Sequence, residues 1–274
     1  MSSINTNIGA MIALQNLNVI TADLAATQNR ISTGLKVGSA KDNGAVWAIA
    51  QNQRVQVSSL DAVKDSLSRT SSVIDVALAA GNSVSDLLSQ LREKALEASD
   101  TSLDTTARTA LNADFTSIRD QITKTLSNAG FNGINLVDGS RANTSALANA
   151  QGTSRMTVAA QNMSLGGTIV TLAATASFAT ATSAGNLLTT LDSSINNVSL
   201  ALAHLGTSSK ALDAHATFVG KLQDTLNAGI GNMVDADMAK ESARLQSLQI
   251  KQQLAVQALS IANQSSSYIL KLFQ

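Results

Sequence analysis

Few side chains in this sequence could do chemistry, and their spacing does not favour it. The chain has two histidines and no cysteine. His204 and His215 are eleven residues apart, so on one helix they would share a face but lie roughly 16 Å apart along the axis. One metal ion cannot bridge that separation, and two ordinary surface histidines are the simpler interpretation. HExxH, Walker A and GxSxG patterns are also absent from the sequence.

Two further groups have simple structural explanations. Asp23, Lys41 and Asp42 could be interpreted as an acid–base group, but helix capping and solvated charge account for them. The single Trp47 could support a ligand, but packing at the start of a long helix accounts for it as well. The sequence therefore predicts a protein that is not an enzyme and that has no cofactor, no catalytic residues and no metal site.

Composition limits the fold and the partners. The chain has no proline and only 3% aromatic residues, which permits unusually long helices and argues against a thick globular centre. The formal net charge is zero, and no basic cluster points to nucleic acid. The first residues lack the charged and apolar regions of a signal peptide. No run of about 18 apolar residues is evident, so we expect no membrane span.

Apolar residues recur every three or four positions through two long segments, a pattern typical of coiled-coil-like helix seams. We expect one helix over 44–99, a second over 107–129 that folds back antiparallel to it, and another from about residue 184 to 226. In the first of these helices the seam consists of Leu60, Val63, Leu67, Thr70, Ile74, Ala77, Gly81, Val84, Leu88, Leu91, Ala95 and Ala98.

The middle of the chain has a different character. Short β-favouring runs at 134–137, 156–159 and 168–172 are separated by Gly, Asn and Ser, which predicts hairpins and loops. We also expect a turn at 229–231 before the last helix, and a helix-start signal in Ser39 and Asp42.

Both ends of the chain read as amphipathic helices with almost no charge. Residues 1–30 carry only Asp23 and Arg30, and residues 245–274 carry only Lys251 and Lys271. A surface helix would cover its outer face with charged residues, so these helices suit packing by other chains. We therefore predict pairing of the two ends and self-assembly through Ile8, Leu17, Ile20, Leu24, Ile31, Leu245, Leu248, Ala255, Leu259, Ala262, Ile269 and Phe273.

Several sequence motifs in a fixed order resemble bacterial flagellins. They are INTN at 4–7, ISTGLKVGSAKD at 31–42, FNGINLVDG at 131–139, DADMAKES at 235–242 and QALSIANQ at 257–264. The resemblance covers about residues 1–140 and 185–274. Local departures from the family pattern occur at Asn43, Gly44, Val46 and Ser266.

The resemblance implies a mostly α fold: a long antiparallel helical rod with coiled-coil-like seams, paired terminal helices and a small central β-hairpin region. It implies an inner-tube domain (1–33 and 230–274), a rod domain (34–140 and 185–229) and a short β-rich surface insertion (141–184). The middle is short, so large outer domains are not expected.

The same resemblance implies a structural subunit of the extracellular flagellar filament. Such a subunit is exported unfolded by the type III flagellar apparatus and polymerises with itself beneath a cap protein to serve motility. Cap and hook-junction proteins, the export apparatus and a secretion chaperone are the implied partners.

Three alternatives stay open at this stage. A junction or adaptor protein would share the terminal helices, although the motif at 131–139 and the C-terminal motifs favour a filament subunit. Residues 91–96 match the helix position where an innate receptor binds some flagellins, but Lys94 replaces a typically apolar residue. The Ser/Thr-rich middle is either plain polar loop or a carrier of O-linked glycans at Thr168, Thr171, Thr175, Ser177, Thr180, Thr182 and Ser183.

Overall fold

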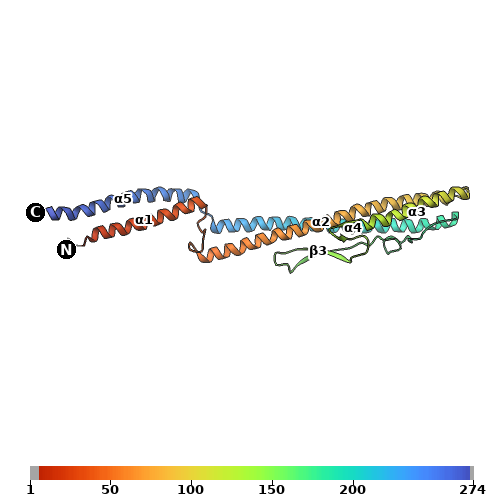
Figure 1. Ribbon diagram of the computed structural model, residues 1–274, viewed down its shortest axis with the longest axis horizontal. Helices are drawn as coiled ribbons and strands as arrows, with labels where there is room; N and C mark the ends of the chain where they lie inside the picture. The colour runs from red at the N-terminus through yellow and green to blue at the C-terminus, as the bar shows by residue number, and fades with distance from the viewer. Residues whose placement is uncertain (1–5, 272–274) are drawn as a thin grey trace. The chain divides into compact units, whose positions relative to one another are not determined.

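The structure, a computed structural model, describes the backbone of residues 6–271 and the side chains of residues 6–264. Within this range five helices hold most of the chain (Figure 1). They are α1 (Ile8–Thr33), α2 (Gly44–Ala98), α3 (Thr105–Ser127), α4 (Ala181–Val234) and α5 (Met238–Lys271). Four short strands lie between α3 and α4: β1 (Gly130–Phe131), β2 (Ile134–Asn135), β3 (Asn143–Leu147) and β4 (Arg155–Ala159). The predicted mostly α fold with a small central hairpin region is confirmed.

The chain forms two compact units. The first unit joins Met1–Val55 to Thr225–Gln274, and the second is Gln56–Asp224. The boundaries fall within α2 and α4, and not at the turns that end helices.

In the second unit the predicted seam of α2 forms the core. All twelve positions from Leu60 to Ala98 are buried. The matching stripe of α4 is buried or half-buried throughout, and α3 contributes Phe115 and Ile122, which are fully buried. Burying a Val, Leu, Ile or Phe side chain stabilises a fold by about 1.5–3 kcal/mol. This continuous seam is therefore the main source of stability in the second unit.

One seam position is closely surrounded by neighbouring side chains. A Cβ atom added at Gly81 would lie 2.6 Å from Leu202 Cδ2, and Met163 Cε and Sδ would lie 3.2 and 3.3 Å away. Met163 itself is fully buried. The missing side chain in α2 therefore admits Met163 from the loop and Leu202 from α4.

The turn from α2 to α3 is held by a buried arginine. Arg108 Nε donates to Ala98 O at 3.0 Å, and its Nη2 donates to Asp100 O at 2.8 Å and to Leu103 O at 3.2 Å. These carbonyls belong to the end of α2 and the connecting turn, where no helical amide can reach them. The guanidinium thus satisfies them and fixes the connection between the two helices.

The central strands form two antiparallel hairpins, β1–β2 and β3–β4. Asn132 and Gly133, between β1 and β2, have φ values of 50° and 73°, as a two-residue hairpin turn requires. The end of β3 is attached to the helices of its unit: Leu147 N donates to Ser66 Oγ at 3.0 Å, and His215 Nε2 donates to Ala148 O at 2.8 Å. His215 therefore has a structural role in holding the hairpin.

Two expectations about local structure were wrong, and one strand was not predicted. Residues 168–172 form no strand, because side chains of α4 take up their backbone groups: Thr171 N donates to Ser194 Oγ, and Asn197 Nδ2 donates to Ile169 O. Residues 229–231 are not a turn, since α4 continues to Val234. Strand β3 was not predicted, because its sequence NTSAL lacks β-branched and aromatic residues apart from one threonine.

The start of α2 also differs from the expected signal. Asn43 Oδ1 accepts from Val46 N at 3.1 Å and so caps the helix. Asp42 instead closes the preceding turn, where its Oδ2 accepts from Ser39 N, Ser39 Oγ and Gly38 N. The hydrogen bonds from Ser39 and Gly38 lower the pKa of Asp42 below its ordinary value.

Candidate interaction surface

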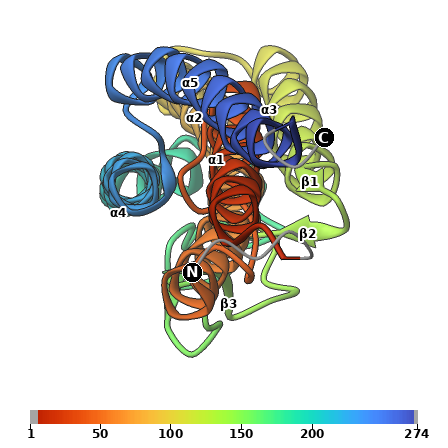
Figure 2. The ribbon, with the colours of Figure 1, turned by 90° about the vertical axis from the view of Figure 1, so that its left-hand side faces the viewer.

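The terminal helices α1 and α5 pack side by side in opposite directions within the first unit (Figures 1 and 2). Near the start of α1, Asn7 Oδ1 caps the helix by accepting from Ala10 N at 3.0 Å, and Asn7 Nδ2 donates to Ala262 O at 2.8 Å. At the other end of the pair, Arg30 Nη1 lies 3.4 Å from Glu241 Oε1. The predicted pairing of the two ends is therefore observed.

Glu241 is the most constrained polar group of this pair. Glu241 is 7% exposed. Its second carboxylate oxygen, Oε2, has no hydrogen-bond partner among the described residues. Thr27, one turn before Arg30, is 1% exposed. The pair is thus tightest where α1 ends and α5 begins.

The two connecting segments beside this end are hydrogen-bonded to each other. Lys36 N and Val37 N both donate to Val234 O, at 2.8 and 3.2 Å, and Ala236 N donates to Gly34 O at 2.8 Å. Gly34 has a φ of 72° and ends α1 in the left-handed conformation, which glycine adopts without strain. These bonds fix the exit of α1 next to the entry of α5.

The residues predicted for self-assembly lie mostly at the contact between α1 and α5 of the same chain. Leu248 is buried and Ile8 is 63% exposed. The other described members are half-buried on the facing sides of the pair: Leu17, Ile20, Leu24, Ile31, Leu245, Ala255, Leu259 and Ala262. The side chains of Ile269 and Phe273 lie outside the described residues.

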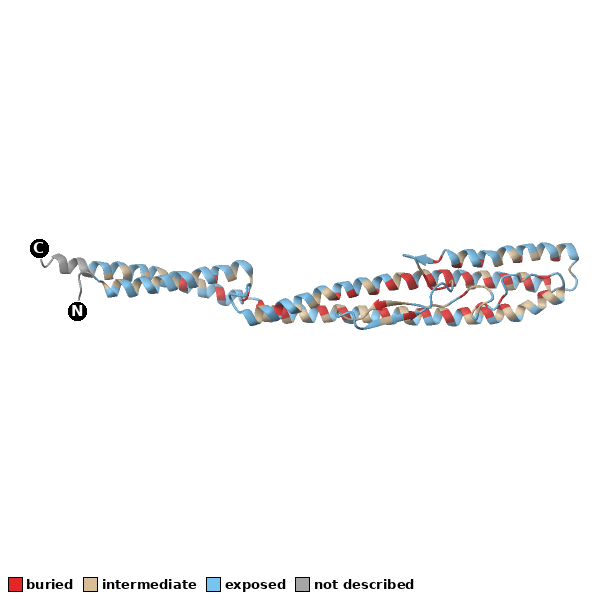
Figure 3. Ribbon diagram, turned by 60° about the horizontal axis from the view of Figure 1, so that its bottom comes forward, coloured by how far each residue is buried: buried red, intermediate tan, exposed pale blue. Residues whose placement is uncertain are grey.

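A second set of apolar side chains, which shares only Ile8 with the predicted set, faces outward. Ten of the sixteen exposed large hydrophobic residues belong to α1 and α5, although these helices hold less than a quarter of the chain. Much of the terminal pair is exposed in Figure 3, in contrast to the buried residues that recur along the long helices. Exposed large hydrophobic residues concentrated on one pair of helices indicate a site of protein interaction. The ten are Ile8, Met11, Ile12, Leu14, Val19, Met238, Ile250, Leu254, Val256 and Ile261.

Of this outward set only Ile8 was predicted from the sequence, because the prediction followed a single stripe along each helix. The sequence did contain a signal for it. In both terminal helices apolar residues occur around most of the helix circumference, and charged residues are nearly absent from all sides. A helix that is apolar on most sides is a buried helix. In this chain alone, α1 and α5 are not buried.

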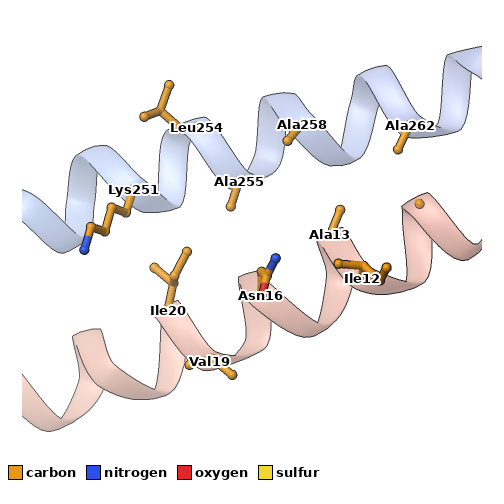
Figure 4. Close-up of a pocket in the computed structure, with 11 residues that line it drawn as sticks. Ile12, Ala13, Asn16, Val19, Ile20, Lys251, Leu254, Ala255, Ala258 and Ala262 are labelled. Carbon is orange, nitrogen blue, oxygen red and sulfur yellow. The ribbon is translucent and has the colours of Figure 1, made fainter.

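One flank of the pair is hollowed. A cavity of about 630 Å³ lies between the helices, and Figure 4 shows Ala13 of α1 and Ala255, Ala258 and Ala262 of α5 around it. Ile12, Val19 and Leu254 lie at its edges, and Lys251 is the one charged residue that lines it. Asn16 and Ile20 of α1 also line it and point toward α5 in Figure 4. The result is a mostly apolar groove with one amide, in which the alanines leave room for apolar side chains.

Helix α1 also has the length and apolar composition of a membrane-crossing helix, with a mean hydropathy of 1.3 over an 18-residue window that is entirely unburied. Length and composition are the only grounds for this resemblance, so the expectation of no membrane span stays a prediction. Alanines between the larger apolar residues raise the mean, but Asn16, Asn18, Thr21 and Asp23 interrupt the segment. We interpret α1 as a packing helix because its inner stripe contacts α5.

The remaining candidate residues have ordinary environments. His204 is exposed, Trp47 is half-buried at the start of α2, and the described residues contain no cluster of His, Asp and Glu that could hold a metal. Arg92 pairs with Asp192 of α4, and this contact raises the pKa of Arg92. The pair links α2 to α4 on a solvated face.

The seven Ser and Thr residues proposed as glycan acceptors fall into two groups. The hydroxyls of Thr171, Thr180 and Ser183 are engaged in hydrogen bonds with nearby groups. The other four side chains are exposed and make no such bond within the described part of the chain: Thr168, Thr175, Ser177 and Thr182. Only the second group presents free hydroxyls.

Comparisons with known proteins agree with this architecture. Residues 4–142 match the family model of the bacterial flagellin N-terminal helical region, and residues 188–273 match that of the C-terminal helical region. Flagellin FljM of Caulobacter vibrioides is 60% identical over 274 residues, which cover 100% of this chain and 99% of that protein. A flagellin of Brucella melitensis is 35% identical and fully covered on both sides.

A solved structure described as a putative flagellar hook-associated protein from Vibrio parahaemolyticus has a similar fold. Its TM-score is 0.58 at 15% sequence identity, and the match covers 71% of this chain and 100% of that one. The two family models together match far more than half of the sequence. The N-terminal model covers α1 and the C-terminal model covers α5, the two helices that pair. The chain therefore belongs to the bacterial flagellin family, as one of its short forms.

Proposed function

We propose that this chain is the structural subunit of an extracellular bacterial flagellar filament and that the α1–α5 pair joins the subunits. The role of the α1–α5 pair in joining subunits is supported by the outward apolar surface of that pair, which the chain itself leaves uncovered. Burying apolar surface contributes about 25 cal/mol per Å², so repeated contacts between such pairs would stabilise a polymer.

The three-part division of the chain follows from this role. Residues 1–33 and 230–274 supply the inner tube, residues 34–140 and 185–229 the surrounding helical domain, and residues 141–184 a surface insertion. The uncharged terminal helices support the first assignment, and the loops and hairpin at 141–184 support the last, since exposed loops tolerate variation.

Export and assembly partners come from the family as a whole. The subunit would pass unfolded through the type III flagellar apparatus, aided by a secretion chaperone, and add beneath a cap protein on top of the hook-junction proteins. The absence of cysteine supports this route, because a chain without thiols cannot be cross-linked while unfolded. A structural role also supports the prediction that the protein is not an enzyme.

A flagellar junction protein is the alternative role. Resemblance to the hook-associated fold supports it, but that similarity is one of fold only. Full-length identity of 60% to a flagellin supports the filament role more strongly. Abundance separates the two roles, since a filament subunit dominates sheared surface filaments and a junction protein is scarce in them.

Truncation tests the assembly role. Removing residues 1–20 or residues 255–274 should abolish polymerisation, as measured by sedimentation and electron microscopy, while the second unit stays helical by circular dichroism. A short tag inserted at Gly152, an exposed residue between β3 and β4, is the control and should leave assembly intact. Normal filaments from either truncated chain would refute the proposal.

Glycan attachment needs its own measurement. We propose Thr168, Thr175, Ser177 and Thr182 as the accessible acceptors, because their hydroxyls are exposed and unbonded in the described structure. Intact-mass spectrometry of native filaments should show added sugar mass that maps to these residues. An unmodified mass would reject glycosylation without affecting the filament role.

A further inference from the structure

We propose that copies of this chain stack face to back through the terminal helix pair, with an apolar ridge on one side of the pair seated in the groove on the other. The ridge consists of Leu14 and Val256. The groove is the 630 Å³ hollow around Ala13, Ala255, Ala258 and Ala262 (Figure 4). This inference rests on the proposed function and specifies which surfaces meet in the polymer.

The groove has the shape of a receptor for side chains. Four alanines at its centre leave space that larger residues would fill, and Ile12, Val19 and Leu254 are exposed at its edges by 55%, 57% and 58%. Protein interiors are close-packed and leave few voids of this size. An apolar side chain from outside would therefore gain contacts on several sides in this groove.

The ridge lies on the reverse side of the same pair. Leu14 follows Ile12 by two residues and Val256 follows Leu254 by two, and two residues turn a helix through about 200°. Since Ile12 and Leu254 both border the groove, Leu14 and Val256 project from the opposite flank. Leu14 is 48% exposed and Val256 is 52% exposed.

Charge on the two sides is compatible with this contact. The groove contains one ammonium group, that of Lys251, which has no ion pair among the described residues. By helix geometry the reverse side carries Asn18, Gln253 and Ser260 beside the ridge, with no charged residue. A ridge of this composition buries no like charge against Lys251 and offers polar oxygens that can accept from it.

A ridge-to-groove contact joins two different surfaces, so it does not close on itself as a two-fold contact does. After one contact, one copy retains a free groove and the other retains a free ridge. Repetition of the contact therefore adds further copies, in an open filament or a ring according to the rotation between copies, which a groove-to-groove contact would not do. The second copy of this chain is the occupant that the arrangement favours.

Three neighbouring residues of α5 give a matched test. Ala258 lines the groove, Val256 lies on the ridge, and Gln257 points about 100° from each, away from both surfaces. All three are exposed, so substitutions should leave the free subunit folded. The variants are Ala258→Trp, which fills the groove, Val256→Asn, which makes the ridge polar, and the control Gln257→Trp.

The critical concentration for polymerisation of the full-length chain is the measurement, with circular dichroism of the free subunit as the check on folding. We expect Ala258→Trp and Val256→Asn each to raise it about tenfold or more, since about 1.4 kcal/mol of lost contact gives that factor. Gln257→Trp should stay within about twofold of the unsubstituted chain.

The outcomes separate this inference from the proposed function. If the unsubstituted chain fails to polymerise under any tested condition, the proposed function fails. If it polymerises and Ala258→Trp does so equally well, the groove is not an interface. If only Val256→Asn is unaffected, the groove takes something other than the ridge, and the face-to-back contact is wrong. Equal loss in Gln257→Trp would also overturn it, because the effect would not depend on the face.

Discussion

The helices of the second unit and the terminal helix pair use the same apolar spacing with opposite results. In α2 all twelve seam positions are buried within the chain. In α1 and α5 the described buried residues are Thr27, Glu241 and Leu248, while ten large hydrophobic residues are exposed. The spacing of apolar residues therefore identifies a helix face, whereas the number of neighbouring helices decides whether that face is covered. The second unit is complete by itself and the terminal pair is not.

Hydrogen exchange of the free subunit should give the largest contrast. We expect slow exchange for amides in 60–98 and 188–226 and fast exchange in 6–30 and 245–271, because isolated helices with few buried contacts are marginal in water. The opening free energies should differ by several kcal/mol, up to the about 5–15 kcal/mol of global unfolding. Strong protection of the terminal segments in a verified monomer would contradict the difference between the two regions. It would show that the α1–α5 pair is stable before assembly.

Leucine truncation is the next largest effect. Leu91→Ala should lower the free energy of unfolding of the free subunit by about 2–5 kcal/mol, because Leu91 is fully buried. Leu254→Ala is the matched variant in α5, and as Leu254 is 58% exposed it should change that free energy by less than about 0.5 kcal/mol. Chemical denaturation checks both. Similar losses from the two variants would contradict the proposed difference in coverage.

Glycine substitution sharpens the description of the second unit. Gly81→Ala should destabilise it by about 1–3 kcal/mol, because the added methyl group would meet Leu202 and Met163. Gly206→Ala in α4 is the control: no atom lies within 4 Å of the added Cβ, and alanine in a helix interior is favoured over glycine by about 0.5–1 kcal/mol. Thermal unfolding should therefore shift in opposite directions for the two variants.

The smallest effect concerns the turn before α2. Because hydrogen bonds from Ser39 and Gly38 lower the pKa of Asp42 in the folded state, their stabilisation is present above the ordinary value of 3.8 and is lost as the pH falls through the lowered pKa. Asp42→Ala should thus be slightly less stable than the unsubstituted chain at neutral pH, and the two stabilities should converge in acid. Chemical denaturation of both chains at a series of pH values measures the difference, and a difference that stays constant into acid would contradict the role of Asp42 in this turn.

Much of the fold followed from sequence patterns that depend on nearby residues only. The seam of α2 was predicted position by position, because a period of three or four residues and the absence of proline act along a single helix. The pairing of the chain ends was predicted on a different ground: both terminal helices carry almost no charge and so need partners that cover them. The strand expected at 168–172 failed because Ser194 and Asn197, far along the chain, provide hydrogen bonds to this segment.

The candidate surface shows the same limit. Leu17, Ile20 and Leu24 were identified from their stripe, but a stripe does not say whether the covering neighbour belongs to the same chain. Only the packing of α1 against α5 assigned that stripe to the intramolecular contact and left Ile12, Leu14 and Val19 outside.

The sequence by itself determined the helical class, the long seams and the nearly uncharged terminal helices, because periodicity, charge and the lack of proline act locally. Tertiary structure alone decided three further features. These are the close surroundings of Gly81, the clamp of Arg108 on the helix connection, and the groove and ridge on opposite flanks of the terminal pair. Each depends on which distant residues come within contact distance, and spacing along one helix carries no information about that.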